Sequence, residues 1–171
     1  MVKCIVEINS STVGSTGRIM FMIAETARKH GFTVYTCSAV HGNEKRIESK
    51  NHIYIGSKLD KKIHLLLAKK TGYNGCFSHF TTAQFLKKID KLQPDLIHFH
   101  NLHNCYINLP MLFDYVKKKN IPVVWTLHDC WAYTGHCPYY DFVHCNKWMT
   151  GCYDCPQTAK YPYSDVDRSK E

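Results

Sequence analysis

Residues 123–129 read Val-Val-Trp-Thr-Leu-His-Asp, and this stretch decides the fold class that we predict. Its β-branched and apolar residues indicate a short strand, which carries a titratable pair, His128 and Asp129, at its carboxyl end. Ligands of open α/β sheets bind just beyond the carboxyl ends of the strands. The stretch therefore predicts a parallel sheet and a candidate site at one edge of it.

Along the rest of the chain, further strand-like runs alternate with helical patterns. Residues 17–30, for example, carry Ile19, Ile23 and Ala27 at helical spacing, and Gly31 follows as a terminator. Such alternation predicts a Rossmann-like α/β fold, in which a mostly parallel sheet has helices on both faces. The predicted strands are 2–8, 33–39, 52–55, 95–100 and 122–127, and the predicted helices are 17–30, 59–70, 82–92 and 109–119.

The length of 171 residues and the composition bound the organisation of the chain. One domain is expected at this length, and we assign it to residues 1–156, including a Cys-rich loop at 130–156, with a linker-like tail at 157–171. No apolar run approaches the roughly 18 residues of a membrane-spanning helix, and Glu7 interrupts the first apolar run too early for a signal peptide. We therefore predict a cytoplasmic protein.

The formal net charge of +8 comes mostly from lysine and favours anionic partners such as nucleotides, phosphates or the inner face of a membrane. A solvated, lysine-rich surface without a specific partner is the alternative. No Lys/Arg block is dense enough to indicate a nucleic-acid-binding arm, so we expect no nucleic acid as a partner.

The loop after the first strand, residues 9–18, is rich in Ser, Thr and Gly and leads into a helix. Gly14 and Gly17 allow the backbone to approach a ligand closely, and the free N–H groups of a helix start, together with Arg18, suit a phosphate. The loop has neither the Gly-x-Gly-x-x-Gly pattern nor a Gly-Lys-Ser/Thr sequence. An ordinary turn is therefore the alternative to phosphate binding.

Polar residues also follow the strand predicted at 95–100. His100, Asn101 and His103 fall at its carboxyl end, beside the expected crevice, and are candidate site residues for that reason. His98 projects from the same strand face as His100 and is expected to be a buried residue with local hydrogen bonds. A His-x-His metal site is the alternative.

His128 is the residue best suited to chemistry at the end of the last predicted strand. The ordinary pKa of a histidine lies close to neutrality, so the ring can donate, accept or shuttle a proton, and Asp129 could orient it. The alternative is structural, with Asp129 as a capping residue beside a core histidine.

Nine cysteines in a chain expected to be cytoplasmic favour thiols or metal ligands over disulfides. The spacing Cys152-x-x-Cys155 is typical of a zinc knuckle, and four thiolates could staple a loop that lacks its own core. Reduced thiols packed under aromatic rings, and a redox or disulfide role, are the alternatives. The candidate ligands of a structural zinc ion are Cys137, Cys145, Cys152 and Cys155, with His136 or His144 as a substitute for one cysteine.

Three stretches together resemble the N-terminal half of bacterial glycosyltransferases of family 4, in the branch that builds exopolysaccharide, colanic-acid-like and capsule chains. They are residues 94–103 (PDLIHFHNLH), 121–137 (IPVVWTLHDCWAYTGHC) and 147–157 (KWMTGCYDCPQ). The resemblance implies a GT-B fold, with two Rossmann-like domains that face each other across a cleft. It also implies retaining transfer of a sugar from a nucleotide-sugar donor to a polysaccharide or lipid-linked acceptor, without a metal or other cofactor for catalysis. If the acceptor is lipid-linked, we also expect the protein to contact the inner membrane peripherally.

The resemblance further implies roles for individual residues. Carried over by position, His128 would be the catalytic residue and would contact hydroxyl groups of the donor sugar. Gly17 and Arg18, with Gly14 of the same loop, would lie near the donor diphosphate and stabilise its charge. The acceptor side would be lined by His100, Asn101, His103 and Asp129.

The chain also departs from the family pattern. Its 171 residues contain no second Rossmann domain and no Glu-x7-Glu motif. We therefore expect half of an active site, inactive without its C-terminal donor domain. The alternatives from other functional classes are a zinc-stabilised, non-enzymatic binding module for anionic partners, including nucleic acid, and a thiol-redox protein built on Cys152-x-x-Cys155.

Overall fold

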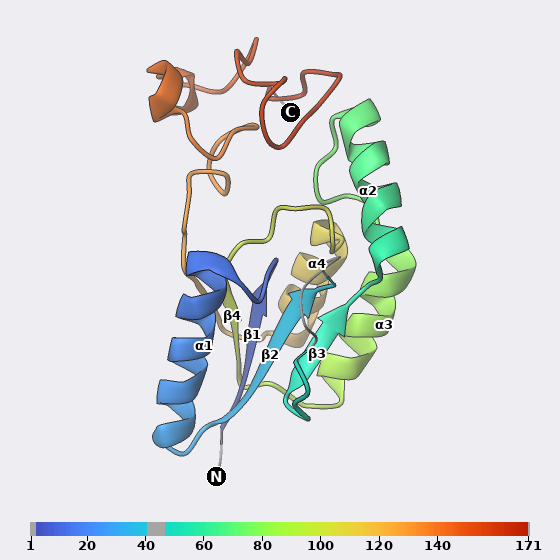
Figure 1. Ribbon diagram of the computed structural model, residues 1–171, viewed down its shortest axis with the longest axis vertical. Coiled ribbons are helices and arrows are strands. Elements are labelled where there is room, and N and C mark those ends of the chain that lie inside the picture. Colours follow the sequence, from blue (N-terminus) through green and yellow to red (C-terminus); the bar gives the residue numbers. More distant parts are fainter. Residues whose placement is uncertain (1–2, 41–46, 171) are drawn as a thin grey trace.

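A five-stranded parallel sheet forms the centre of the structure, a computed structural model that describes residues 3–40 and 47–170 (Figure 1). The strands are β1 (Cys4–Asn9), β2 (Thr33–Ala39), β3 (His52–Ile55), β4 (Leu96–Phe99) and β5 (Val123–Trp125). Their order, β3-β2-β1-β4-β5, confirms the predicted Rossmann-like α/β fold. Val2, at which we expected the first strand to begin, lies outside the described residues.

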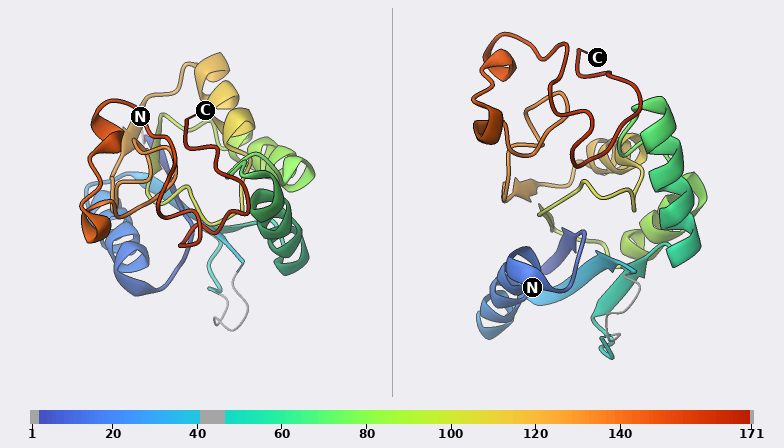
Figure 2. Two further views of the ribbon diagram at one scale, coloured as in Figure 1. Left: turned by 90° about the horizontal axis from the view of Figure 1, so that it is seen from above. Right: turned by 45° about the horizontal axis from the view of Figure 1, so that its top comes forward.

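Helices cover both faces of the sheet, as the alternation predicts (Figures 1 and 2). They are α1 (Gly14–Lys29), α2 (Lys58–Thr71), α3 (His79–Asp90) and α4 (Leu109–Lys119). The first of these begins at Gly14 rather than at residue 17, because the loop already turns at Val13, whose N–H donates to the Ser11 hydroxyl (3.1 Å). In the part of the chain that the structure describes, no helix is both long and apolar enough to cross a membrane.

The strand order places a crevice above β1 and β4. The chain leaves β1 towards β2 and β3, then crosses back so that β4 and β5 extend the sheet on the other side of β1. Loops that leave two neighbouring strands in opposite directions open a gap at the carboxyl edge, where such sheets usually bind ligands. The candidate residues after β1, β4 and β5 therefore share one edge of the sheet.

The two faces of β1 and β4 differ in polarity. On one face, apolar side chains pack into the main core together with residues of α3 and α4. Because side chains alternate along a strand, the neighbouring residues project from the opposite face, and these are polar but also buried. The apolar face carries Val6, Ile8, Ile97 and Phe99, and the polar face carries Glu7, Asn9, His98 and His100.

The chain beyond β5 forms an irregular segment that lies above the carboxyl ends of the strands (orange to red in Figure 1). Its described residues include two short 3-10 turns, Asp141–Val143 and Lys147–Met149. Residues 157–170, which we expected as part of a linker-like tail, fold back towards α2. There the Asp165 N–H donates to the Lys69 carbonyl (2.7 Å).

Candidate functional site

A buried carboxylate, that of Glu7 in β1, is the centre of the polar sheet face. The parallel register pairs Glu7 with His98 of β4, and His100 follows on the same face. Glu7 Oε2 accepts hydrogen bonds from His98 Nδ1 (3.0 Å) and His100 Nε2 (2.8 Å). His98 Nε2 also bonds the Thr126 hydroxyl (2.8 Å), which confirms that His98 is buried and locally hydrogen-bonded.

A further hydrogen bond leads from His100 to His128. His100 Nδ1 lies 2.9 Å from His128 Nε2, and the planes of the two stacked rings are 19° apart. Because an ionised carboxylate only accepts, His100 carries its proton on Nε2, and its Nδ1 accepts the Nε2 proton of a neutral His128. His128 Nδ1 then keeps a lone pair. We call this chain of Glu7, His100 and His128 the histidine relay, and it runs from the buried sheet face to a half-buried imidazole.

The surroundings favour an ionised Glu7 and a neutral His128. Burial opposes the charge of Glu7, but the hydrogen bonds from His100 and His98 outweigh it and lower the pKa of the carboxyl. Burial lowers the pKa of His128, and the neighbouring His100 lowers it further. At neutral pH the relay therefore ends in an uncharged ring that can accept a hydrogen bond.

Asp129 does not orient His128, so this prediction is wrong. The strand ends at Trp125, and both residues lie on the loop that follows, where they find different partners. Asp129 Oδ2 bonds His103 Nε2 (2.8 Å), and its Oδ1 accepts the Trp131 N–H (3.0 Å). Burial opposes ionisation of Asp129, but these hydrogen bonds outweigh it and lower the pKa of the carboxyl.

The predicted acceptor-side residues contact both the tail of the chain and the end of β1. His103 bonds Asp129 through Nε2 and the Tyr161 hydroxyl through Nδ1 (2.7 Å). A residue of the tail therefore takes part in this group. Asn101 donates its backbone N–H to Asn9 Oδ1 (3.2 Å), which ties the loop after β4 to the end of β1. One pocket at the carboxyl edge is lined by His100, Asn101, His103 and Asp129 together with His128.

The glycine loop lies at the start of α1, and packing accounts for one of its glycines. At Gly17 a Cβ would lie 2.5 Å from the Thr12 carbonyl carbon, so glycine alone fits against the loop there. Gly14 has φ +74° and open space where a Cβ would be, and Arg18 is exposed. Phosphate binding by Gly14, Gly17 and Arg18 stays a prediction.

A metal ion at the buried carboxylate is disfavoured by the short contacts there. In residues 3–40 and 47–170, Glu7, His98 and His100 are the one group of three potential ligand atoms within 4.8 Å of one another. Zinc bonds to N and O of about 2.0–2.2 Å hold tetrahedral ligand atoms roughly 3.4 Å apart. The observed 2.8 and 3.0 Å are direct hydrogen bonds, so we interpret the group as a hydrogen-bond network.

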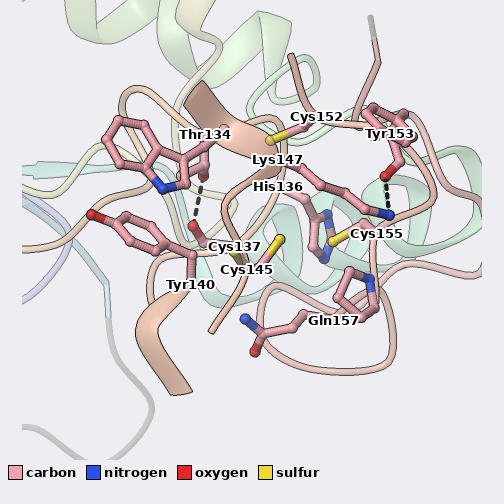
Figure 3. Close-up of a pocket in the computed structure, with 12 residues that line it drawn as sticks. Thr134, His136, Cys137, Tyr140, Cys145, Lys147, Cys152, Tyr153, Cys155 and Gln157 are labelled. Atoms are coloured by element: carbon pink, nitrogen blue, oxygen red, sulfur yellow. Dashed lines mark hydrogen bonds between the residues drawn. The ribbon is translucent and has the colours of Figure 1, made fainter. Parts of the chain in front are cut away.

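The four candidate cysteine ligands come together in a pocket of the irregular segment (Figure 3). All nine cysteines of the chain are free thiols. His136 lines this pocket as well, whereas His144 does not. The pocket, which we call the thiol pocket, is lined by Cys137, Cys145, Cys152 and Cys155.

A wider hollow adjoins the site on the other side of Trp125 and Trp131. Tyr73 and Phe113 line it, as does Arg168, whose guanidinium lies 4.2 Å from the centre of the Tyr73 ring. Aromatic rings beside a guanidinium offer apolar faces and hydrogen-bond donors together. The hollow is therefore suited to a polar organic ligand.

Three residues of this site were not predicted. Glu7 carried a signal, because a carboxylate within an apolar strand needs a buried partner. Asn9 carried a weaker signal as a polar residue at the end of the same strand. Tyr161 carried none, because it lies 58 residues from His103 in the sequence and meets it through the fold of the tail.

Comparison with known proteins identifies the family of the chain. A relative from Escherichia coli (strain K12), described as a putative colanic acid biosynthesis glycosyl transferase WcaC, is 40% identical over 83 residues. The match covers 46% of this chain and 20% of the relative's length. The sequence model of Glycosyltransferase Family 4 matches residues 16–154, which include His100 and His128. Because that match spans most of the sequence, the chain belongs to Glycosyltransferase Family 4.

Proposed function

We propose that the protein transfers a sugar from a nucleotide-sugar donor to a saccharide or lipid-linked acceptor with retention of configuration. This chain provides the acceptor-side half of the active site. The observation that carries the proposal is the histidine relay, which links the buried Glu7 through His100 to His128 at the carboxyl edge of the sheet. A hydrogen-bonded network anchored in the protein interior holds a side chain in one orientation, as an active site requires.

In this proposal His128 binds the donor sugar and aligns it for reaction. Its Nε2–H is held by His100, so its Nδ1 can accept a hydrogen bond from a sugar hydroxyl. The lowered pKa of His128 keeps the ring neutral near pH 7 and preserves that acceptor. Such a contact contributes to catalysis through orientation.

We assign the donor diphosphate to the start of α1, near Gly14, Gly17 and Arg18. The helix has no side-chain cap there, so its first-turn N–H groups and its positive dipole end suit a phosphate. Arg18 adds a cation that would stabilise the charge of the departing nucleoside diphosphate. The proposal therefore includes no metal or other cofactor for catalysis.

We assign the acceptor to the other side of His128. The paired His103 and Asp129 offer hydrogen bonds, and the hollow beside Trp125 and Trp131 offers aromatic faces for sugar rings. The net charge of +8 favours an acceptor that carries phosphate. A lipid-linked acceptor at the cytoplasmic face of the inner membrane, contacted peripherally, would meet that requirement.

The remaining donor contacts are assigned to a second Rossmann-like domain outside these 171 residues. The matched relative extends well beyond the aligned region, which covers 20% of its length. We therefore expect that this chain does not transfer a sugar without such a donor domain.

The test uses the complete protein and a panel of nucleotide-sugars, with hydrolysis and transfer followed by mass spectrometry. His128→Ala is expected to lower kcat about tenfold or more, because one lost alignment contact of about 1.4 kcal/mol corresponds to a factor of ten. His79→Ala is the matched control, since His79 is exposed on α3 away from the site. Equal rates for both variants would refute the role of His128. Failure of the complete protein to bind or hydrolyse any nucleotide-sugar would refute the proposed function.

A further inference from the structure

The irregular segment beyond β5 is held by hydrogen bonds and ion pairs rather than by a share of the main apolar core. In the described part of the chain, the apolar residues that pack into or against the main core end at Trp131. The regular structure of the segment consists of two 3-10 turns, and a small aromatic cluster forms around Trp148, which contacts Tyr133 and Tyr140. The segment, residues 126–170, is close in size to the units of about 40 residues or fewer that usually need a disulfide or a metal to be stable. The segment is therefore one that a cross-link would stabilise.

The thiol pocket lies within this segment and has the size of a metal site. Its cavity is about 10 Å³, which admits a sphere of roughly the size of one water molecule. Figure 3 shows Cys145 and Cys155 beside the His136 ring, and Cys152 at the edge of the same pocket. The lining residues that carry an electron-pair donor suited to zinc are Cys137, Cys145, Cys152, Cys155 and His136.

His136 has an unpaired nitrogen in this pocket. The residue is 7% exposed, and its ring bonds the backbone of Gln157 and Lys160, but its Nε2 has no hydrogen-bond partner among the described residues. Because the backbone carbonyls accept the proton of the other ring nitrogen, Nε2 keeps a lone pair. A buried polar atom without a partner costs about 1–3 kcal/mol. His136 is therefore a fifth candidate donor beside the four thiols, which by themselves suffice for a tetrahedral ion.

The four thiols lie close enough to one another that their thiolates would repel, and a bound divalent cation would stabilise those thiolates. The Gly135 N–H already donates to Cys152 Sγ (3.3 Å), a contact that orients and stabilises a metal-bound thiolate.

The turn between Cys152 and Cys155 is held in shape by neighbouring side chains. Lys147 Nζ donates to the carbonyls of Tyr153 (3.0 Å) and Asp154 (2.9 Å). The Cys155 N–H donates to a carboxylate of the tail, Asp167 Oδ2 (2.6 Å). Two of the thiols are therefore presented by one ordered turn, in the Cys-x-x-Cys spacing of zinc knuckles.

We propose that Cys137, Cys145, Cys152 and Cys155 bind one Zn²⁺ as four thiolates. Zinc–sulfur bonds of about 2.3 Å hold tetrahedral sulfurs roughly 3.8 Å apart. Within residues 3–40 and 47–170, no three of these sulfurs lie within 4.8 Å of one another, so binding draws the loops together. A four-thiolate site has no open position, so the ion is structural. It holds the segment above the carboxyl edge of the sheet, beside the proposed acceptor side.

The first test measures zinc and thiols in the complete wild-type protein, purified without chelators. We expect one zinc per chain by mass spectrometry of the metals. After denaturation with a chelator but without a reductant, every cysteine of the protein, including the nine of these 171 residues, should react as a thiol. Replacement by Co²⁺ should give the sulfur-to-cobalt charge-transfer absorption of a thiolate site. Protein without zinc that also shows no such absorption with Co²⁺ would overturn the proposal. Fewer reactive thiols than cysteines would indicate disulfides and would overturn it as well.

Variants identify the ligands. Cys155→Ser is expected to lose the zinc, whereas Cys130→Ser, in the same segment but outside the thiol pocket, should retain it. His136→Asn should also retain it. Loss of zinc from His136→Asn, with retention in Cys152→Ser, would overturn the four-thiolate assignment in favour of His136.

A measurement on the wild-type chain avoids variants that fail to fold. Removal of zinc by a chelator should open residues 130–170 to limited proteolysis while the sheet stays resistant. Addition of Zn²⁺ should restore protection. An unchanged cleavage pattern after complete zinc removal would overturn the structural role of the ion.

Discussion

Replacement of Glu7 by Gln tests whether the buried carboxylate organises the histidine relay. The substitution keeps the shape of the side chain but removes the charge that His98 and His100 share through Oε2. A hydrogen bond to a charged group contributes about 1.5–3 kcal/mol and a neutral one about 0.5–1.5 kcal/mol, so two weakened bonds lose about 2–3 kcal/mol. The lower cost of burying a neutral amide offsets part of this loss. We therefore expect Glu7→Gln to lower the free energy of unfolding by about 2 kcal/mol.

Urea denaturation at pH 7, followed by tryptophan fluorescence, measures this change. Glu25→Gln is the matched control, because Glu25 is exposed on α1 and pairs with the exposed Lys29 (2.9 Å), so that variant should unfold close to wild type. Nitrogen NMR of the imidazoles gives a second readout, since the tautomers of His100 and His128 depend on the carboxylate. Equal unfolding free energies for the two variants, with unchanged tautomers, would refute the reasoning.

Two further predictions concern the fold. Burial lowers the pKa of His64 to about 4, so the unfolded chain takes up the proton first, and stability should fall by about 2–3 kcal/mol as the pH drops from 6.5 to 4. In His64→Asn the amide can still donate to Ser78 Oγ, but no group titrates at this position. The free energy of unfolding, measured by urea denaturation, should therefore depend less steeply on pH in this variant than in the wild type. An equally steep dependence would contradict the prediction. Gly17→Ala should destabilise the protein by about 1–3 kcal/mol, because the new Cβ meets backbone atoms of Thr12 at 2.5 and 2.7 Å. Thermal unfolding measures this loss against the exposed control Ser15→Ala, and equal melting temperatures would contradict it.

Much of the fold was predictable because its signals are local. The bounds of β2, β3 and α4 agree with those expected from the sequence, since strand and helix periodicities are written into consecutive residues. The class of sheet follows from the alternation of these elements. The position of His100, His103 and His128 at one edge follows in turn, because the carboxyl ends of parallel strands lie together.

The partners within the site were less predictable. Sequence neighbours suggested that Asp129 orients His128, but the loop after β5 directs Asp129 to His103. The missed residue Glu7 lies 93 positions from its partner His100. Nothing in either local pattern states that β1 and β4 pair, or in which register.

The sequence by itself determined the α/β class, the family and the set of polar residues at the carboxyl edge. The tertiary structure decided which of them act together: Glu7 with His100 and His128, Asp129 with His103, and the four cysteines in one pocket. The physical reason is the separation along the chain of the residues that interact. Secondary structure depends on steric and hydrogen-bonding preferences between residues a few positions apart. Hydrogen-bonded relays and metal sites depend on separations of about 3–4 Å between atoms that strand order and loop closure bring together.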